Sequence, residues 1–210
     1  MVRRMRDRGI TKPSSKAAVA ASLAVVGLIA SIWSFMGGTP APGSAEALAR
    51  TMGTMTAIVG ALMTLNYLYA MSLVGKLRRG EGVIASWTVP PAEFDSFRAV
   101  ERARTTRKNN WRIPRGDWPS GLPVVFGPNA VLVGDTYFKL LGKGMSRFAS
   151  VRTESDAVSS VEFAMRLTIY AAGTLNQTAH YRGHLRIPIA KGASVQAARA
   201  ISHFQRAIGD

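Results

Sequence analysis

Two long runs without a charged residue constrain this chain more than any other feature of its sequence. The first, AAVAASLAVVGLIASIWSFM, covers residues 17–36, and the second, TMGTMTAIVGALMTLNYLYAMSLVG, covers residues 51–75. A transmembrane helix takes about 20 residues to cross roughly 30 Å of hydrocarbon, and both runs are that long. A buried core helix is the alternative for either run, and a cleaved signal peptide is the alternative for the first. Because a helical hairpin explains both runs together, we expect two retained transmembrane helices, a hairpin over residues 17–75.

Basic residues on the outer sides of the two runs predict the orientation of the hairpin. They lie in the leader, residues 1–16, and directly after the second run, at Arg3, Arg4, Arg6, Arg8, Lys12, Lys16, Lys76, Arg78 and Arg79. The Pro- and Gly-rich linker between the runs has only Arg50, which is offset by Glu46. Because cytoplasmic flanks of membrane helices are enriched in Lys and Arg, we expect both termini in the cytoplasm.

Small residues recur along one face of each run. They are Ala17, Ala20, Ala24, Gly27 and Ser31 in the first run, and Gly53, Ala57 and Gly60 in the second. Small side chains let two helix backbones approach closely in lipid, so we expect this face to pack the hairpin. Oligomerisation, or docking on a larger membrane complex, is the alternative. Asn66 is polar and lies inside the second run, and we expect it to hydrogen-bond across the hairpin or to a partner.

The rest of the chain, residues 80–210, is long enough for one compact domain. Short alternating segments predict seven strands, at residues 82–89, 124–126, 130–133, 137–141, 146–155, 159–173 and 178–190. Phe94 and Phe97, spaced three apart behind Pro91, predict a helix inserted after the first strand. A second amphipathic helix is predicted for residues 194–208.

Three stretches of this region carry a resemblance to a known family. They are GVIASWTVPPAEF, VVFGPNAVLVGDTYFKL and LRIPIAKGASVQAARAI. Their order resembles the pleckstrin-homology-like domains of bacterial membrane proteins, in which a helical hairpin precedes a small barrel plugged by its last helix. The resemblance implies a membrane α-helical hairpin plus an α+β cytoplasmic domain, a seven-stranded barrel with a C-terminal capping helix and an inserted helix. An unrelated α+β sheet with packed helices is the alternative.

No motif in the sequence gives a reason to propose a reaction. The chain has no cysteine, no GxxxxGK[ST] phosphate loop, no GxGxxG after a strand and no GxSxG. His180 and His184 share a face of one expected strand, but at ~3.4 Å per residue they lie about 13–14 Å apart, too far to ligate one metal. We therefore expect no catalytic residue, no cofactor, no metal and no small-molecule substrate.

Basic and aromatic residues gather after the second run and along the inserted helix and the loop behind it. The chain carries 27 Lys and Arg against 12 Asp and Glu, a formal net charge of +15, which favours a polyanionic neighbour. We expect an anionic lipid or a partner protein to bind at Lys76, Arg78, Arg79, Arg98, Arg102, Arg104, Arg107, Lys108, Trp111, Arg112, Arg115 and Trp118. Tryptophans favour the headgroup level of a bilayer, and each base near an anionic leaflet gains about 1 kcal/mol. A solvated basic face without a ligand is the alternative.

Together these features predict a non-enzymatic scaffold or accessory protein of the bacterial inner membrane. The resemblance implies a homo-oligomer or a larger membrane complex. Because few residues separate Arg79 from the first strand, we expect the domain to stay close to the inner leaflet. One alternative is a membrane-surface enzyme acting on a lipid or peptide. The other is a membrane-tethered nucleic-acid binder, although the sequence has no helix-turn-helix or zinc-finger motif.

Overall fold

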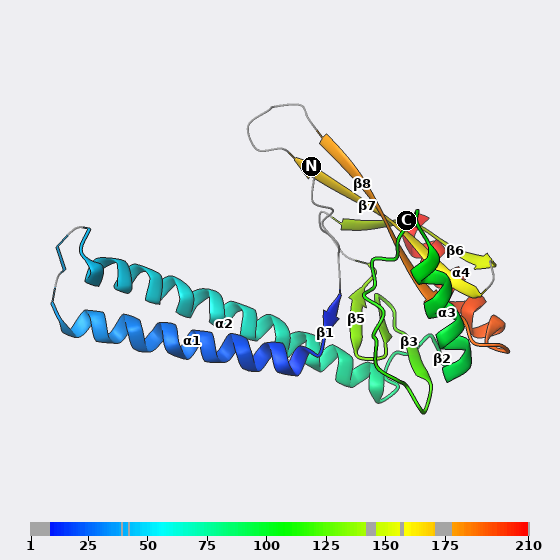
Figure 1. Cartoon of the computed structure of the whole chain (residues 1–210), viewed down its shortest axis with the longest axis horizontal. Helices are drawn as coiled ribbons and strands as arrows, with labels where there is room; N and C mark the ends of the chain where they lie inside the picture. The colour runs from blue at the N-terminus through cyan, green and yellow to red at the C-terminus, as the bar shows by residue number, and fades with distance from the viewer. Residues whose placement is uncertain are drawn as a thin grey trace. The chain divides into compact units, whose positions relative to one another are not determined.

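The structure is a computed structural model of the 210-residue chain. It describes residues 9–38, 40–41, 43–141, 146–155, 158–170 and 178–209. The chain divides into two compact units (Figure 1). One unit holds residues 12–75, and the other holds residues 76–210 together with the N-terminal segment that ends at Thr11. The first unit is helical, and the second contains all of the β-structure in the part of the chain that the structure describes.

Both apolar runs form long helices, α1 over Pro13–Met36 and α2 over Ala45–Arg78 (Figure 1). Pro13 occupies the first turn of α1, where a missing backbone N–H costs no hydrogen bond. Ser44 Oγ accepts a hydrogen bond from the N–H of Ala47 at 3.2 Å and so caps the start of α2. The helices are longer than the apolar runs because the polar residues that flank each run also adopt helical conformation.

Most side chains of these two helices are exposed. Within the most apolar window of each helix, 22% of residues are buried in α1 and 17% in α2. Val26 and Leu62, for example, are 63% and 62% exposed. The core helix of a soluble protein would instead be mostly buried. The described chain therefore contains two helices that are long and apolar enough to cross a membrane.

The folded unit consists of two antiparallel sheets and two helices. The larger sheet has five strands in the order β1-β5-β4-β3-β2, and the smaller has three in the order β6-β7-β8. The strands are β1 (Ile10–Thr11), β2 (Ala85–Val89), β3 (Leu122–Phe126), β4 (Ala130–Val133), β5 (Thr136–Lys139), β6 (Ser146–Ser155), β7 (Ser159–Tyr170) and β8 (Thr178–Pro188). The helices are α3 (Pro91–Ala103), inserted after β2 as predicted, and the C-terminal α4 (Ser194–Gly209).

Sequence patterning missed the short strand β1. Ile10 and Thr11 pair with Tyr137 and Thr136 of β5, at the outer edge of the larger sheet. Of the predicted leader, residues 1–16, Ile10 and Thr11 therefore belong to the folded unit, whereas residues 12–16 belong to the helical unit. A strand of two residues is too short to show an alternating hydrophobic pattern, which is why the sequence did not reveal it.

The expectation of a closed seven-stranded barrel is wrong. The seven predicted strands are all present as β2–β8, but they divide between two sheets. The outer edges of the three-stranded sheet are occupied by other groups. Asn110 N donates to His184 O of β8 at 2.7 Å, and Gln205 Nε2 of α4 donates to Val151 O of β6 at 3.2 Å. Because a loop and a helix occupy these edges, the two sheets are not closed by one continuous ladder.

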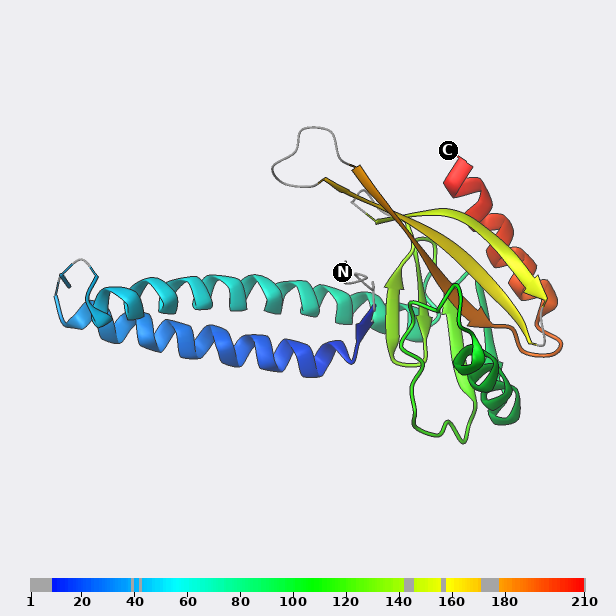
Figure 2. The same ribbon diagram turned by 45° about the horizontal axis from the view of Figure 1, so that its top comes forward.

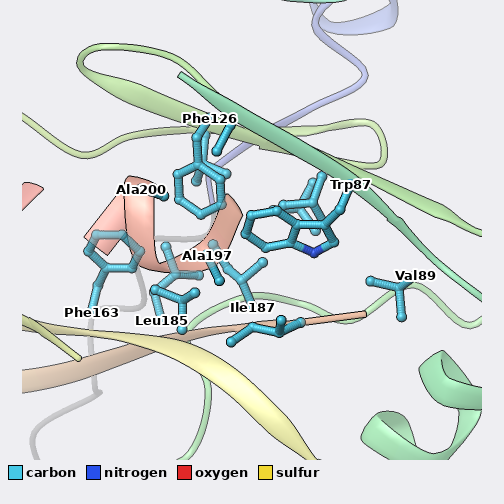
Figure 3. Close-up of a cluster of buried hydrophobic side chains, with 14 of the residues drawn as sticks. Trp87, Val89, Phe126, Phe163, Leu185, Ile187, Ala197 and Ala200 are labelled. Carbon is cyan, nitrogen blue, oxygen red and sulfur yellow. The ribbon is translucent and has the colours of Figure 1, made fainter. Parts of the chain in front are cut away.

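The core lies where both sheets meet α4. Trp87 and Phe126 of the larger sheet face Phe163 of the smaller sheet across a cluster that includes small residues of α4 (Figure 3). The Phe204 ring of α4 lies 6.0 Å from Phe126 and 5.5 Å from Phe163, centroid to centroid. Trp87 Nε1 donates to the carbonyl of Pro188 at 3.0 Å, so a hydrogen bond also joins the two sheets. Figure 2 shows α4 lying along the three-stranded sheet.

Candidate interaction surface

The structure separates the predicted basic and aromatic cluster into buried and exposed members. Trp111 is only 3% exposed, and its ring lies 6.2 Å from Phe94 and 6.3 Å from Phe97 between centroids. Trp118 is partly buried against the same core. The expectation that both tryptophans reach a headgroup layer is therefore wrong for Trp111, which is a core residue. Trp118 has only part of its side-chain surface available for contact with a headgroup.

Several predicted cations already have partners within the folded unit. Arg78 Nη2 lies 2.8 Å from Asp135 Oδ1, and Arg79 Nε lies 2.7 Å from Glu81 Oε1. Arg98 stacks its guanidinium over the Phe94 ring and donates to the carbonyl of Gly116 at 3.0 Å. These contacts reduce what the three arginines can offer to an external anion.

Five other cations are exposed, and we call them the basic surface. They are Arg102 at the end of α3, followed by Arg107, Lys108, Arg112 and Arg115 in the loop between α3 and β3. None of the five forms an ion pair within the described chain, where Lys76 is likewise exposed and unpaired. The basic surface therefore has its charges available for an external partner.

A buried ion cluster lies beneath this loop. The side chain of Arg186 on β8 is completely buried, and that of Glu101 on α3 is 3% exposed. Arg186 donates from Nε and Nη2 to the two carboxylate oxygens of Glu101, at 2.7 and 3.1 Å. Arg104 extends the cluster, with Nε 3.0 Å from Glu101 Oε1 and Nη1 donating to Glu154 Oε1 at 3.2 Å. The pair of Arg186 and Glu101 is bidentate, which is the geometry in which a guanidinium and a carboxylate interact most strongly.

Glu162 of β7 is the second buried acid of the cluster. Its side chain is 1% exposed and accepts hydrogen bonds from Arg152 Nε and Nη2 at 2.9 and 2.7 Å. His184 Nδ1 lies 2.7 Å from Glu162 Oε1, and Arg186 Nη1 approaches the same oxygen at 3.4 Å. Burial by itself would raise the pKa of Glu162, but the hydrogen bonds and charge of Arg152, assisted by His184, hold that pKa below its usual range.

The ion cluster also holds the loop that carries the basic surface. Arg186 Nη2 donates to the carbonyl of Arg107, whose backbone has a left-handed conformation with φ of 48°. Asn109 Nδ2 donates to Arg186 O at 2.8 Å, and Asn109 Oδ1 accepts from Arg186 N at 3.2 Å. A non-glycine residue keeps a left-handed conformation only where its surroundings fix it. The loop therefore has a defined path along β8, although it contains no helix or strand of its own.

The chemistry of the ion cluster is that of a structural core. Its carboxylates on Glu101, Glu154 and Glu162 each lie against at least one arginine. Among the residues that the structure describes, no three His, Asp or Glu side chains group together in a way that could hold a metal ion. The side chain of His180 lies outside the described set. What the cluster offers is a rigid support for the exposed cations above it.

The small residues predicted for hairpin packing lie at a close contact between α1 and α2. A Cβ atom added to Gly27 would lie 2.6 Å from Ala57 N, and one added to Gly60 would lie 2.7 Å from Ala24 N. Gly53, Ala17 and Ala20 are buried in the same unit, and Ser31 Oγ lies 2.8 Å from Thr54 Oγ1.

Asn66 does not share this contact. It is exposed on α2, so the expectation of a hydrogen bond across the hairpin is wrong. One predicted alternative remains for this amide, a partner outside the hairpin.

Sequence reasoning missed the residues of the buried ion cluster. The described buried positions that share an element with Glu101 or Arg186 are apolar, and Glu162 lies between the buried Val161 and Phe163. A charged residue inside an otherwise apolar pattern was the available signal, but the pairing of β7 with β8 was needed to bring Glu162 opposite Arg186. Comparison with protein-family models, with curated proteins and with solved structures finds no match for this chain. Its function must therefore be argued from the arrangement of its own residues.

Proposed function

We propose that this chain is a non-enzymatic, membrane-anchored scaffold or accessory protein whose folded unit docks on anionic lipid headgroups. The observation that carries the proposal is the basic surface, a set of unpaired cations on a loop held in place by buried ion pairs. The two apolar helices supply an anchor that keeps the folded unit attached to the bilayer. Anchoring raises the effective concentration of headgroups around the domain, so even weak contacts are populated.

Preorganisation of the loop favours this function over a solvated face without a ligand. Each Lys or Arg near an anionic leaflet contributes about 1 kcal/mol, and the cost of ordering a flexible loop would cancel much of that gain. In this protein the loop is already ordered by folding, because Asn109 and the carbonyl of Arg107 are bound to Arg186 before any lipid is contacted. The cations of the loop are therefore presented without a further ordering step.

We further propose that the protein belongs in the bacterial inner membrane with both termini in the cytoplasm. The basic flanks at Lys12, Lys16, Lys76 and Arg78 support this orientation, since cytoplasmic flanks are enriched in such residues. The folded unit would be a relative of the pleckstrin-homology-like domains with two open sheets. A meander of β2–β5, a second meander of β6–β8 and a C-terminal helix against both support that relationship.

A partner helix in the membrane is favoured by one separate observation. Asn66 lies ten residues before Lys76 on α2, about 15 Å along the helix, and its side chain is exposed. An amide facing hydrocarbon lacks a hydrogen-bond partner, and an adjacent helix can provide one. This supports a place in a homo-oligomer or in a larger membrane complex.

The lipid-docking proposal is tested with the full chain in nanodiscs. Because the chain has no cysteine, Thr106→Cys provides a single, exposed labelling site beside the basic surface. A fluorophore at this site is expected to be quenched by spin-labelled headgroups in phosphatidylglycerol nanodiscs, and much less in phosphatidylcholine nanodiscs. Equal quenching in both lipids would overturn the proposal.

A matched pair of charge variants distinguishes the contribution of the basic surface to lipid docking from that of net charge. One combines Arg107→Gln, Lys108→Gln and Arg112→Gln. The control combines Lys191→Gln, Arg199→Gln and Arg206→Gln, three exposed cations on or near α4. At about 1 kcal/mol per base, the first variant is expected to weaken docking on the order of 100-fold, and the control much less. An equal loss of lipid docking in both variants would show that docking depends on the net charge of the protein and not on the basic surface.

A further inference from the structure

Two adjacent threonines stand between members of the basic surface. Thr105 and Thr106 are exposed, and they lie between Arg102 at the end of α3 and Arg107 in the loop. Within the part of the chain that the structure describes, neither threonine hydroxyl takes part in a hydrogen bond. Both hydroxyl groups are therefore open to a modifying enzyme.

The backbone at the two threonines belongs to neither a helix nor a strand. α3 ends at Ala103, and Arg104 behind it has extended backbone, with φ of −66° and ψ of 122°. Phosphoryl transfer by a kinase requires the target oxygen to approach the γ-phosphorus of ATP in line with the leaving oxygen. A hydroxyl on an exposed loop reaches that position without the cost of opening a helix or a sheet.

Contacts on both sides of the pair keep it within the basic surface. On one side, the Arg104 side chain is bound to Glu101 and Glu154. On the other side, the carbonyl of Arg107 accepts a hydrogen bond from the buried Arg186. Because both ends of this short segment are held, a group attached to either threonine stays beside the exposed cations of the loop.

A second hydroxyl shows what the loop adds to the sequence pattern. Arg102 precedes Thr105 by three residues, and Arg199 precedes Ser202 by the same interval. Charge patterns of this kind are what kinases use to select their substrates. Ser202 is also exposed, but it lies within α4, where its carbonyl accepts a hydrogen bond from Arg206. Of these two hydroxyls, only that of Thr105 stands outside a helix.

We propose that Thr105 and Thr106 form a phosphorylation site that regulates the basic surface. A protein kinase selective for basic substrates transfers the γ-phosphoryl group of ATP to Oγ1 of one of the two threonines. The new bond joins Oγ1 to phosphorus, the bond from phosphorus to the ADP leaving group breaks, and the hydroxyl proton passes to a base of the kinase.

Phosphorylation reverses part of the charge that the basic surface presents. A phosphothreonine carries a charge of about −1.5 to −2 at pH 7, and it pairs readily with a neighbouring guanidinium such as that of Arg107. Lipid docking is therefore expected to weaken roughly tenfold or more. This effect on docking rests on the proposed function of the basic surface, whereas the existence of the phosphorylation site does not.

The first test is mass spectrometry of the full chain, isolated with phosphatase inhibitors from the membranes of the cells that produce it. Phosphate is expected on Thr105 or Thr106, and Ser202 is expected to be unmodified. Ser202 is the matched control, because it has the same arginine spacing and is exposed on a helix. Absence of phosphate from both threonines, or equal occupancy at Ser202, would overturn the site.

The second test measures docking with and without the phosphate. Ala103→Cys, at the exposed last residue of α3, provides a labelling site that leaves both threonines intact. The isolated chain is divided, one half is treated with a phosphatase, and both halves are placed in phosphatidylglycerol nanodiscs with spin-labelled headgroups. Phosphatase treatment is expected to strengthen docking roughly tenfold or more. In the double variant Thr105→Ala and Thr106→Ala, the same treatment is expected to change nothing.

The two tests distinguish failure of the site from failure of lipid docking. If the dephosphorylated chain were quenched equally in phosphatidylglycerol and phosphatidylcholine nanodiscs, the lipid-docking function would be wrong, and the phosphate found by mass spectrometry would still establish the site. If the dephosphorylated chain preferred phosphatidylglycerol and phosphatase treatment made no difference to its docking, regulation by this site would be overturned.

Discussion

Arg186 and Glu101 form a bidentate ion pair in which neither side chain is more than 3% exposed. The two residues come from β8 and α3, 85 positions apart in the sequence. Their pairing attaches the inserted helix to the three-stranded sheet, and the same guanidinium binds the carbonyl of Arg107. The stability of the folded unit and the path of the basic loop therefore depend on one side chain.

Replacing Arg186 with methionine is expected to destabilise the folded unit strongly. The substitution keeps an apolar stem of similar length but leaves Glu101 buried without its bidentate partner, and breaking a buried pair in this manner costs about 3–5 kcal/mol. The measurement is urea unfolding of the full chain in nanodiscs, followed by tryptophan fluorescence. Arg199→Met, at an exposed position of α4, is the control and is expected to stay within about 0.5 kcal/mol of the parent. Equal midpoints for both variants would show that the ion pair contributes little.

Asn109→Ala tests whether the loop must be held in place for lipid docking. The substitution removes two hydrogen bonds to the backbone of Arg186 without changing any charge. Amide hydrogen exchange is expected to accelerate in residues 105–112 and to stay unchanged in β7. Lipid-dependent quenching at Thr106→Cys is expected to fall, because the cations are no longer preorganised.

Gln196→Ala, on the exposed side of α4, is the matched control for this prediction, since it also removes a neutral amide. Its quenching is expected to equal that of the parent chain. If Asn109→Ala loosened the loop and left docking unchanged, net charge alone would account for lipid binding.

Strands such as β2 and β7 were predictable because apolar residues on one face alternate with polar residues on the other. Val161 and Phe163 of β7 have no exposed surface, and Glu162 between them points to the other side of the sheet. Local patterning of this kind gave the order of β2–β8, the inserted helix and the C-terminal helix. It could not show whether the strands close into one barrel, because closure depends on which groups occupy the sheet edges.

Burial of polar and amphipathic residues was the part that the sequence could not predict. Trp111 stands among basic residues and therefore has the pattern of a surface anchor, yet Phe94 and Phe97 from the preceding helix enclose it. Arg104 and Arg186 were likewise indistinguishable in sequence from the exposed arginines. Glu101 pairs with Arg186 from another element, as Glu154 does with Arg104, and only the folded arrangement brings these pairs together.

Glu162 makes the stability of the folded unit depend on pH. Its pKa in the folded state lies below its usual value of 4.5, so the folded state favours the ionised form. The stabilisation is complete above that usual value and is lost as the pH falls through the folded-state pKa. Urea unfolding of the parent chain is therefore expected to weaken on acidification by more than that of Glu162→Gln, which has no group to titrate at this position. The difference between the two curves isolates Glu162 from the other carboxylates, and parallel curves would contradict the prediction.

The hairpin makes an equally direct prediction at Gly27. A Cβ atom at this position would lie 2.6 Å from Ala57 N and 2.8 Å from Gly53 O, so any side chain forces the two helices apart. Such overpacking costs typically 1–3 kcal/mol. The measurement is disulfide formation between Ser31→Cys and Thr54→Cys, whose native hydroxyl oxygens lie 2.8 Å apart in a chain without other cysteines.

Oxidation is expected to be fast in the double-cysteine background and markedly slower when Gly27→Leu is added. Gly37→Ala is the control, because a Cβ at Gly37 has no atom within 4 Å and Gly37 lies just past the end of α1. If Gly27→Leu left the oxidation rate unchanged, the close approach of α1 and α2 at Gly27 would not be what holds the hairpin together. A lipid-exposed position for Gly27 would then follow, and the small residues of α1 would be free to receive another helix instead.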